Sequence, residues 1–226
     1  MSHEGRWEQR WHPLRREWVV YSAHRNQRPW DGVVTSKPQP SPSYDKDCYL
    51  CPENERIHGQ INPNYDDVFV FDNDHPVVGR HAPDVVSESP VYKKLKAEGI
   101  SRVICYDPRH NVTVSDLSLG SVTKIVRTWR DQQRQLALLN EIRYVLFFEN
   151  KGEISGTSSL HPHCQLYATN FVFKNVLQEL DVLHDEPNIF AKIVGAEREH
   201  GGRIVAENEH AMAFVPFFAR YSYEVW

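Results

Sequence analysis

The pattern of apolar and polar positions divides most of the chain into short strand-like segments and one clearly helical stretch. Runs rich in β-branched and aromatic residues, which are typical of strands, occur at 17–23, 67–72, 102–106, 143–149 and 163–171. Between the third and fourth of these runs, apolar side chains recur at helical spacing, at Val122, Ile125, Val126, Trp129, Leu136 and Leu139. Asp116 lies where it could cap this helix. Strands with a helix laid across one face predict an α+β fold.

The C-terminal segment changes character twice. Residues 172–200 have a helical pattern, and residues 203–226 have the pattern of two further strands. The chain ends at Trp226 within apolar, strand-forming sequence, without the polar taper that usually closes a domain. We therefore expect a truncated polypeptide.

Composition and charge argue against several classes of protein, among them nucleic-acid binders, secreted proteins and membrane proteins. The 226 residues include 26 Lys and Arg against 30 Asp and Glu, a formal net charge of −4, whereas nucleic-acid binders need a concentrated basic face. The first twenty residues hold no apolar signal segment, and no apolar run reaches the roughly 20 residues that span a bilayer. These features predict a cytoplasmic globular protein that binds neither nucleic acid nor membranes.

The most specific chemical feature is the segment His161-Pro162-His163-Cys164-Gln165 at the start of a predicted strand. Alternate residues of a strand share one face, so His161, His163 and Gln165 should project together. Two imidazoles and a carboxamide are poor core material, which favours a functional site. A polar, half-exposed strand is the alternative.

A C-x-x-C pair, Cys48 and Cys51, has the spacing that lets two thiolates bind one tetrahedral metal ion. The nearest histidines, His58 and His75, lack zinc-finger spacing. The remaining ligands must therefore come from distant sequence, with His110 and His161 as the candidates. Two buried, inert cysteines are the alternative interpretation.

A Gly- and Ser-rich segment from Glu149 to Ser159 runs directly into the histidines. Glycines permit close approach of the backbone, and hydroxyl and free N–H groups suit phosphate oxygens. An ordinary hairpin loop is the more frequent explanation of such a pattern. Its position before His161 favours a phosphate site.

Short stretches spread over nearly the whole chain resemble the motifs of one enzyme family. They are RPW at 28–30, CYLCPENER at 48–56, FDND at 71–74, SRVICYDPRH at 101–110, FFENKG at 147–152, HPHCQ at 161–165 and the segment 203–225. In this order they resemble the galactose-1-phosphate uridylyltransferases of the histidine-triad superfamily. The resemblance implies an antiparallel sheet with helices on one face in an N-terminal half at 1–176, followed at 177–226 by the start of a truncated C-terminal half.

The resemblance also assigns roles to residues. His163 would be the nucleophile, supported by Gln165, and a structural zinc would lie on Cys48, Cys51, His110 and His161. Nucleotide contacts would come from Arg25, Arg28, Leu50, Ile57, Asn73, Asp74, Asn150, Gly156, Thr157, Ser158 and Gln165, with the two arginines reaching the neighbouring subunit of a homodimer. Glu179 matches a ligand of a second, iron-type metal. Ser159-Leu160 departs from the Asn-Pro usual in the family, which leaves the path of the loop open.

The implied reaction is a double displacement in galactose metabolism. A neutral imidazole is nucleophilic near pH 7 because its unperturbed pKa is about 6.5. His163 would take the uridylyl group from UDP-glucose, release glucose 1-phosphate and pass the group to galactose 1-phosphate. Gln165 could donate to a non-bridging phosphate oxygen.

Two other interpretations stay open. A nucleoside-diphosphate-sugar phosphorylase of the same superfamily would use the same histidine with inorganic phosphate as acceptor. A catalytically silent, zinc-stabilised fragment would keep the nucleotide pocket without the half that binds the sugar phosphate.

Overall fold

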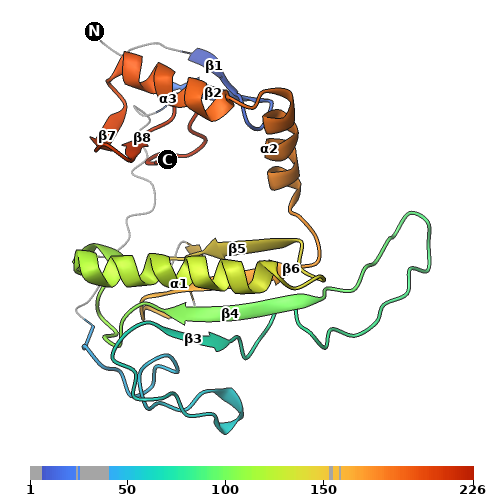
Figure 1. Ribbon diagram of the computed structural model, residues 1–226, viewed down its shortest axis with the longest axis vertical. Coiled ribbons are helices and arrows are strands. Elements are labelled where there is room, and N and C mark those ends of the chain that lie inside the picture. Colours follow the sequence, from blue (N-terminus) through green and yellow to red (C-terminus); the bar gives the residue numbers. More distant parts are fainter. Residues whose placement is uncertain (1–6, 24, 26–40, 153–154, 158) are drawn as a thin grey trace. The chain divides into compact units, whose positions relative to one another are not determined.

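The computed structural model describes residues 7–23, 25, 41–152, 155–157 and 159–226 (Figure 1). The chain divides into two compact units. Residues 37–172 form one of them, here called the sheet unit. Residues 1–36 and 173–226 form the other, here called the terminal unit.

A four-stranded antiparallel sheet is the centre of the sheet unit. Its strand order is β3 (Phe69–Asp72), β4 (Gly99–Cys105), β6 (His163–Thr169) and β5 (Tyr144–Phe148). A long loop between β3 and β4 projects beyond the end of the sheet (Figure 1). The register places Cys105 opposite His163 and Val103 opposite Gln165. The α+β class and the antiparallel sheet expected from the sequence are thereby confirmed.

One face of this sheet is covered by α1 (Leu119–Ala137). The helix buries Ile125 and Leu136 against apolar side chains of β4, β5 and β6. Burying a leucine or isoleucine side chain stabilises a fold by about 1.5–3 kcal/mol, so these contacts hold the helix on the sheet.

The start of α1 differs from the sequence prediction. Ser118 is the N-cap, and its hydroxyl accepts a hydrogen bond from the Ser121 N–H at 3.1 Å. Asp116 instead belongs to a separate 3₁₀ turn, η3 (Val114–Asp116), where its carboxylate accepts the Thr113 N–H at 2.8 Å. The prediction that Asp116 caps α1 is wrong because the chain makes this extra turn first.

Strand alternation gives the sheet a second face with different chemistry. Ile104, Leu166 and Ala168 face the α1 side and belong to its core. Val103 and Cys105 instead pack against the C-x-x-C segment, where Leu50 and Cys51 are fully buried. Because successive strand residues point to opposite faces, His163 and Gln165 share this second face.

The terminal unit contains two hairpins and two helices. β1 (Trp7–His12) pairs with β2 (Glu17–Ser22), and β7 (Ile204–Glu207) pairs with β8 (Met212–Phe214). α2 (Lys174–Asp185) and α3 (Ile189–His200) replace the single helical stretch expected at 172–200. The core of the terminal unit consists of Leu14, Val182, Ile189, Ile193, Phe214 and Phe218.

Within the described ranges, no helix has both the length and the apolar character needed to cross a membrane.

Candidate active site and metal cluster

Two cysteines and two histidines from distant segments meet on the second face of the sheet unit. The candidate ligand atoms of Cys48, Cys51, His110 and His161 all lie within 4.8 Å of one another, and all four residues are buried. The Cys51 Sγ lies 3.5 Å from His161 Nδ1 and 3.7 Å from His110 Nδ1. These four residues, here called the metal cluster, could hold one metal ion.

Two asparagine side chains hold the C-x-x-C turn in place by donating hydrogen bonds to its backbone carbonyls. The Asn62 amide donates to the carbonyls of Tyr49 and Cys51, both at 2.9 Å. The Asn54 amide donates to the Cys48 carbonyl at 2.8 Å. Inside the turn, the Cys51 N–H donates to the Cys48 carbonyl at 3.1 Å. The positions of both thiols are therefore set by hydrogen bonds to the backbone of the turn that carries them.

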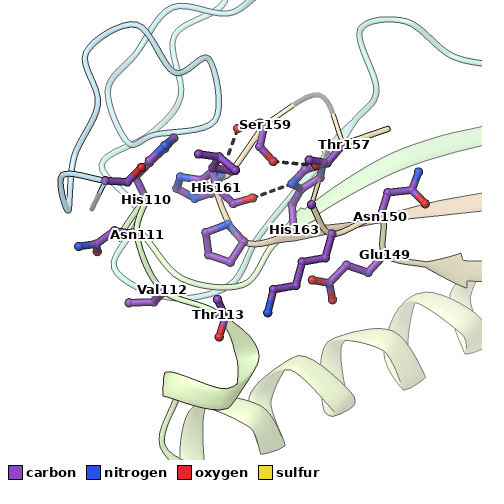
Figure 2. Close-up of a pocket in the computed structure, with 15 residues that line it drawn as sticks. His110, Asn111, Val112, Thr113, Glu149, Asn150, Thr157, Ser159, His161 and His163 are labelled. Carbon is purple, nitrogen blue, oxygen red and sulfur yellow. Dashed lines mark hydrogen bonds between the residues drawn. The ribbon is translucent and has the colours of Figure 1, made fainter. Parts of the chain in front are cut away.

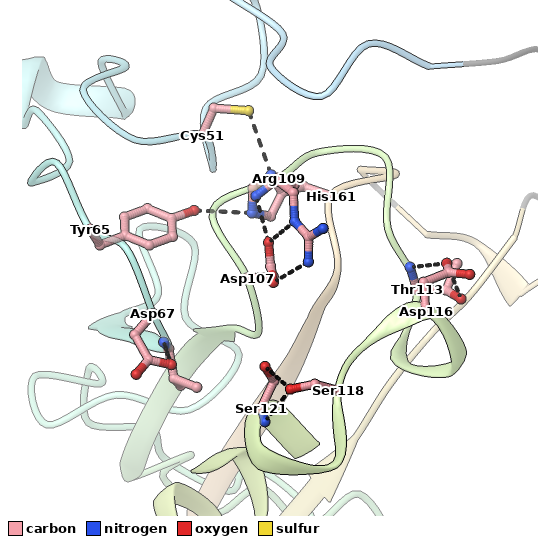
Figure 3. A network of polar contacts seen from close by, with 11 residues as sticks. Cys51, Tyr65, Asp67, Asp107, Arg109, Thr113, Asp116, Ser118, Ser121 and His161 are labelled. Carbon is pink, nitrogen blue, oxygen red and sulfur yellow. Dashed lines mark hydrogen bonds and ion pairs between the residues drawn. The ribbon is translucent and has the colours of Figure 1, made fainter. Parts of the chain in front are cut away.

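The segment that carries His110 is fixed by an aspartate. The Asp107 carboxylate accepts the Arg109 N–H at 2.9 Å and the Arg109 guanidinium at 2.8 and 2.9 Å (Figure 3). Burial alone would raise the pKa of Asp107, but the hydrogen bonds from Arg109 outweigh it and lower that pKa. The His110 N–H donates to the Ser43 carbonyl at 2.8 Å.

Two residues that the sequence did not point to lie directly behind the histidines of the metal cluster. The Tyr65 hydroxyl oxygen lies 3.0 Å from His161 Nε2 (Figure 3). An Asp45 carboxylate oxygen lies 4.0 Å from His110 Nε2. Oxygen partners behind the histidines are typical of metal sites. Neither residue is part of a recognisable spacing, so only the fold reveals them.

Burial favours the neutral forms of Cys51 and His161 when no ion is bound. Desolvation raises the pKa of the Cys51 thiol to about 11. Desolvation, and next the neighbouring His110, lower the pKa of His161 to about 4. A neutral imidazole is the form that binds metals, whereas the thiol must release its proton when a cation arrives.

His163 is the first residue of β6 and is buried. Its Nδ1 lies 2.7 Å from the His161 carbonyl oxygen (Figure 2). Because a carbonyl can only accept a hydrogen bond, Nδ1 carries the proton and Nε2 keeps its lone pair. His161 precedes the strand, so the pleat argument for a shared face holds for His163 and Gln165 but not for His161.

A cavity of about 720 Å³ adjoins His163 on the side of β3 and β4. Of the residues predicted to contact a nucleotide, Ile57, Asn73, Asp74 and Gln165 line it. Leu50 is fully buried and does not line it. The other lining residues are Tyr49, Glu55, Arg56, Phe71, His75, Val103 and His163 itself.

A second cavity, of about 390 Å³, also reaches His163 (Figure 2). The predicted residues Asn150 and Thr157 line it, together with Glu149 and Lys151. Gly156 lies in the same loop but does not line the cavity, and Ser158 falls outside the described residues. His163 is the residue that lines both cavities and carries an unprotonated ring nitrogen.

Three further residues were predicted to bind the nucleotide or a second metal. Arg25 is exposed, and Arg28 falls outside the described residues. Glu179 is half-buried in α2. Among the residues that the structure describes, the metal cluster is the one group able to hold a metal ion, and it does not include Glu179.

Comparison with known proteins gives consistent matches. The family pattern described as galactose-1-phosphate uridyl transferase, N-terminal domain, matches residues 2–172. Galactose-1-phosphate uridylyltransferase of Haemophilus influenzae is 36% identical, and that of Saccharomyces cerevisiae is 35% identical. Each alignment covers 95% of this chain and 63% or 64% of the relative, so the chain spans less than two thirds of their length.

Solved structures show the same fold. A uridylyltransferase structure superimposes with a TM-score of 0.70 at 29% identity, covering 96% of this chain and 64% of the other. An ADP-glucose phosphorylase of Arabidopsis thaliana with bound ADP-glucose superimposes with a TM-score of 0.74. Its identity of 24%, over 98% of this chain and 67% of the other, shows the fold alone.

Proposed function

This chain belongs to the galactose-1-phosphate uridylyltransferase family, and from that premise we propose that it carries the uridylyl-transferring half of such an enzyme. The reaction is the exchange of a uridylyl group between UDP-glucose and galactose 1-phosphate. The observation that carries the proposal is the free Nε2 of His163 between two cavities.

Zinc is the metal that the cluster fits best. A tetrahedral zinc with bonds of about 2.3 Å to sulfur and about 2.0 Å to nitrogen would separate S from N by roughly 3.5 Å. The Cys51 Sγ lies 3.5 and 3.7 Å from the two Nδ1 atoms. Two thiolates and two imidazoles are also the donor set of structural zinc sites. Zinc bound there would fix the entry to β6 and leave no open position for a substrate.

The larger cavity is the proposed site of the nucleotide. Phe71 and Val103 supply an apolar wall, and Asn73 and Asp74 supply polar groups able to bind hydroxyls. Its volume of about 720 Å³ falls in the range of about 300–1,000 Å³ that is usual for ligand sites. The nucleotide would thus lie with its phosphates beside His163.

In the first half-reaction His163 Nε2 attacks the α-phosphorus of UDP-glucose. The new N–P bond forms as the P–O bond to glucose 1-phosphate breaks, and the sugar phosphate leaves as an anion. The ring then carries positive charge. The His161 carbonyl, at 2.7 Å from Nδ1, stabilises that charge without removing the proton.

Gln165 is placed to stabilise the transferring phosphate. Its Oε1 accepts a hydrogen bond from the Tyr167 hydroxyl at 3.2 Å. This bond orients the amide so that its NH₂ group remains available for a non-bridging phosphate oxygen. In the second half-reaction, a phosphate oxygen of galactose 1-phosphate attacks phosphorus, the N–P bond breaks, and His163 is regenerated.

Labelling of the histidines tests this division of roles. After incubation with high concentrations of UDP-glucose, the chain should carry an acid-labile, base-stable uridylyl group on His163. His163→Asn should abolish the adduct and keep the zinc, whereas His161→Asn should lower zinc content and stability together. Peptide mapping that finds the group on His161, or on no histidine, would refute the mechanism.

The acceptor test separates the two transferase interpretations. Labelled chain should return UDP-galactose when galactose 1-phosphate is added. Release of the nucleotide by inorganic phosphate instead would establish the phosphorylase reaction. A homodimer that uses Arg25 and Arg28, an iron-type metal at Glu179 and a cytoplasmic location remain predictions.

A further inference from the structure

We propose that Tyr65 is a positioning residue of the metal cluster, which fixes His161 in the tautomer that turns Nδ1 toward the cysteines. The same hydroxyl ties His161 to the C-x-x-C turn. This inference rests on the zinc site proposed above and adds a residue that no motif identifies.

Two hydrogen-bond partners meet at the Tyr65 hydroxyl. It lies 2.6 Å from the carbonyl oxygen of Leu50, inside the C-x-x-C turn, and 3.0 Å from His161 Nε2. Figure 3 shows the hydroxyl pointing at one nitrogen of the His161 ring and the Cys51 sulfur pointing at the other. The hydroxyl therefore joins two segments of the metal cluster that lie about a hundred positions apart in the sequence.

The phenol has only one proton to donate, and this fixes the direction of both bonds. The Leu50 carbonyl can only accept, so the Tyr65 proton is directed to it. Toward His161 the Tyr65 oxygen must then act as the acceptor, so His161 Nε2 carries the ring proton. The lone pair of the neutral imidazole is left on Nδ1, which faces the Cys51 Sγ at 3.5 Å.

The opposite tautomer would work against metal binding. A proton on Nδ1 would point at the Cys51 sulfur, and the pair would form an N–H···S hydrogen bond in place of two metal bonds. At 3.5 Å this hydrogen bond is geometrically allowed, so nothing in the metal cluster itself prevents it. Tyr65, which is not itself a metal ligand, disfavours this tautomer because its oxygen accepts the proton on His161 Nε2.

Packing keeps Tyr65 in this position. Its ring stacks on Phe69 of β3 with centroids 4.9 Å apart and an interplanar angle of 21°. Phe69 in turn stacks on Phe71 at 5.3 Å.

Zinc affinity of a Tyr65→Phe variant tests the proposal. Competition with a chromophoric chelator should show zinc binding about 10–100-fold weaker than in the wild type, the usual effect of losing a partner behind a metal ligand. Tyr106→Phe is the matched control, because Tyr106 is 2% exposed in the same unit and donates its hydroxyl to Glu149 at 3.2 Å. The control should lose stability and keep its zinc affinity.

A second measurement needs no variant. Nitrogen NMR of the metal-free wild type should show the His161 proton on Nε2, whereas Tyr65→Phe should show a mixture of both tautomers. A proton on Nδ1 in the wild type, or equal zinc loss in both tyrosine variants, would overturn the proposal.

The outcome is separable from that of the proposed function. If the wild type binds zinc and is labelled on His163 while Tyr65→Phe binds zinc equally tightly, only the role of Tyr65 fails. If the wild type binds no zinc, the zinc site and the role of Tyr65 fail together, whatever the labelling shows.

Discussion

A buried histidine in the terminal unit has an unusual set of neighbours. His12 is 1% exposed, and its Nδ1 accepts the Arg15 N–H at 3.3 Å. Its Nε2 is buried without a hydrogen-bond partner, and the ring packs 4.5 Å from that of Phe218. Burial first, and Arg15 next, lower the pKa of His12, while Glu17 and Glu224 oppose the shift and Arg220 adds to it. His12 therefore stays neutral in the folded unit at pH values where an exposed histidine is charged.

This lowered pKa predicts acid sensitivity of the terminal unit. The unfolded chain binds a proton at His12 below about pH 6.5, whereas the folded unit resists it, so stability falls as the pH drops through that value. Urea unfolding followed by tryptophan fluorescence should show a larger loss between pH 7.5 and 5.5 in the wild type than in His12→Asn. The control, His210→Asn, removes a histidine whose side chain is 82% exposed and should behave as the wild type does. Equal pH dependence in all three proteins would contradict the prediction.

Arg56 is a second residue whose role only the fold reveals. Its side chain is 9% exposed in the wall of the larger cavity, with the guanidinium 4.0 Å above the ring of Phe71. Its Nη1 lies 3.6 Å from an Asp74 carboxylate oxygen, which is an ion pair without a direct hydrogen bond. Arg56 thus holds the Asp74 carboxylate in place within the proposed nucleotide site.

Removing this charge should weaken nucleotide binding. We expect Arg56→Gln to bind uridine monophosphate about tenfold more weakly, a change of about 1.4 kcal/mol, because the largely buried Asp74 carboxylate loses the positive charge beside it. Equilibrium dialysis measures the change. Arg102→Gln is the control, because Arg102 pairs with Asp72 at 2.9 Å and does not line the cavity. Unchanged affinity in Arg56→Gln would show that Asp74 does not depend on it.

At the scale of elements, the pairing of β4 with β6 depends on a glycine. A Cβ added at Gly99 would lie 2.2 Å from the Ala168 carbonyl oxygen and 2.9 Å from Val78 Cγ2. Neither the backbone oxygen nor the packed valine can move away without disturbing the strand pair that carries His163. The close approach of two backbones therefore requires glycine at this position.

Gly99→Ala should destabilise the sheet unit by about 2 kcal/mol or more, because overpacking a well-filled site typically costs about 1–3 kcal/mol. Gly120→Ala is the matched control in the same unit, since an added Cβ there would meet only the Ser118 hydroxyl at an ordinary 3.6 Å. It should be neutral or stabilise α1, by up to about 1 kcal/mol. Thermal unfolding measures both, and equal midpoints for the two variants would contradict the packing argument.

Elements with strong periodicity were predictable, and those created by tertiary pairing were not. α1 and the four strands of the main sheet follow directly from their apolar patterns. β1 has no such pattern: Trp7 and Trp11 are exposed, as is Trp18, which lies opposite Trp11, and the strand exists through its pairing with β2. The break between α2 and α3 was missed although its signal is present, because Pro187, which interrupts helices, lies between the two.

At the scale of the whole molecule, motifs predicted which ligands would meet but not what surrounds them. Cys48 and Cys51 are recognisable by spacing, and His110 and His161 were candidate ligands from distant sequence that the resemblance also assigns. Tyr65, Asp45 and Arg56 come from segments whose proximity is set by the loops around β3, and no spacing rule encodes that proximity. The residues that contact the ligands from behind could therefore be identified only from the fold.

The metal cluster joins segments that span most of the sheet unit, from residue 48 to residue 161. All four ligands belong to this unit, and none lies in the terminal unit. Binding of a structural metal is coupled to folding of the segments that it joins. Removal of the metal should therefore affect the two units differently.

Chelation should lower the stability of the sheet unit by several kcal/mol, a shift of the order of 10 °C in its unfolding midpoint. Hydrogen exchange resolves the units: protection should fall at β4, which precedes His110, and at β6, which follows His161, and remain unchanged in α2 and α3. Readdition of zinc should restore protection, and a Cys48→Ser/Cys51→Ser protein should not respond to the chelator. A uniform loss of protection in both units would mean that the metal stabilises more than the sheet, and no loss at all would remove its structural role.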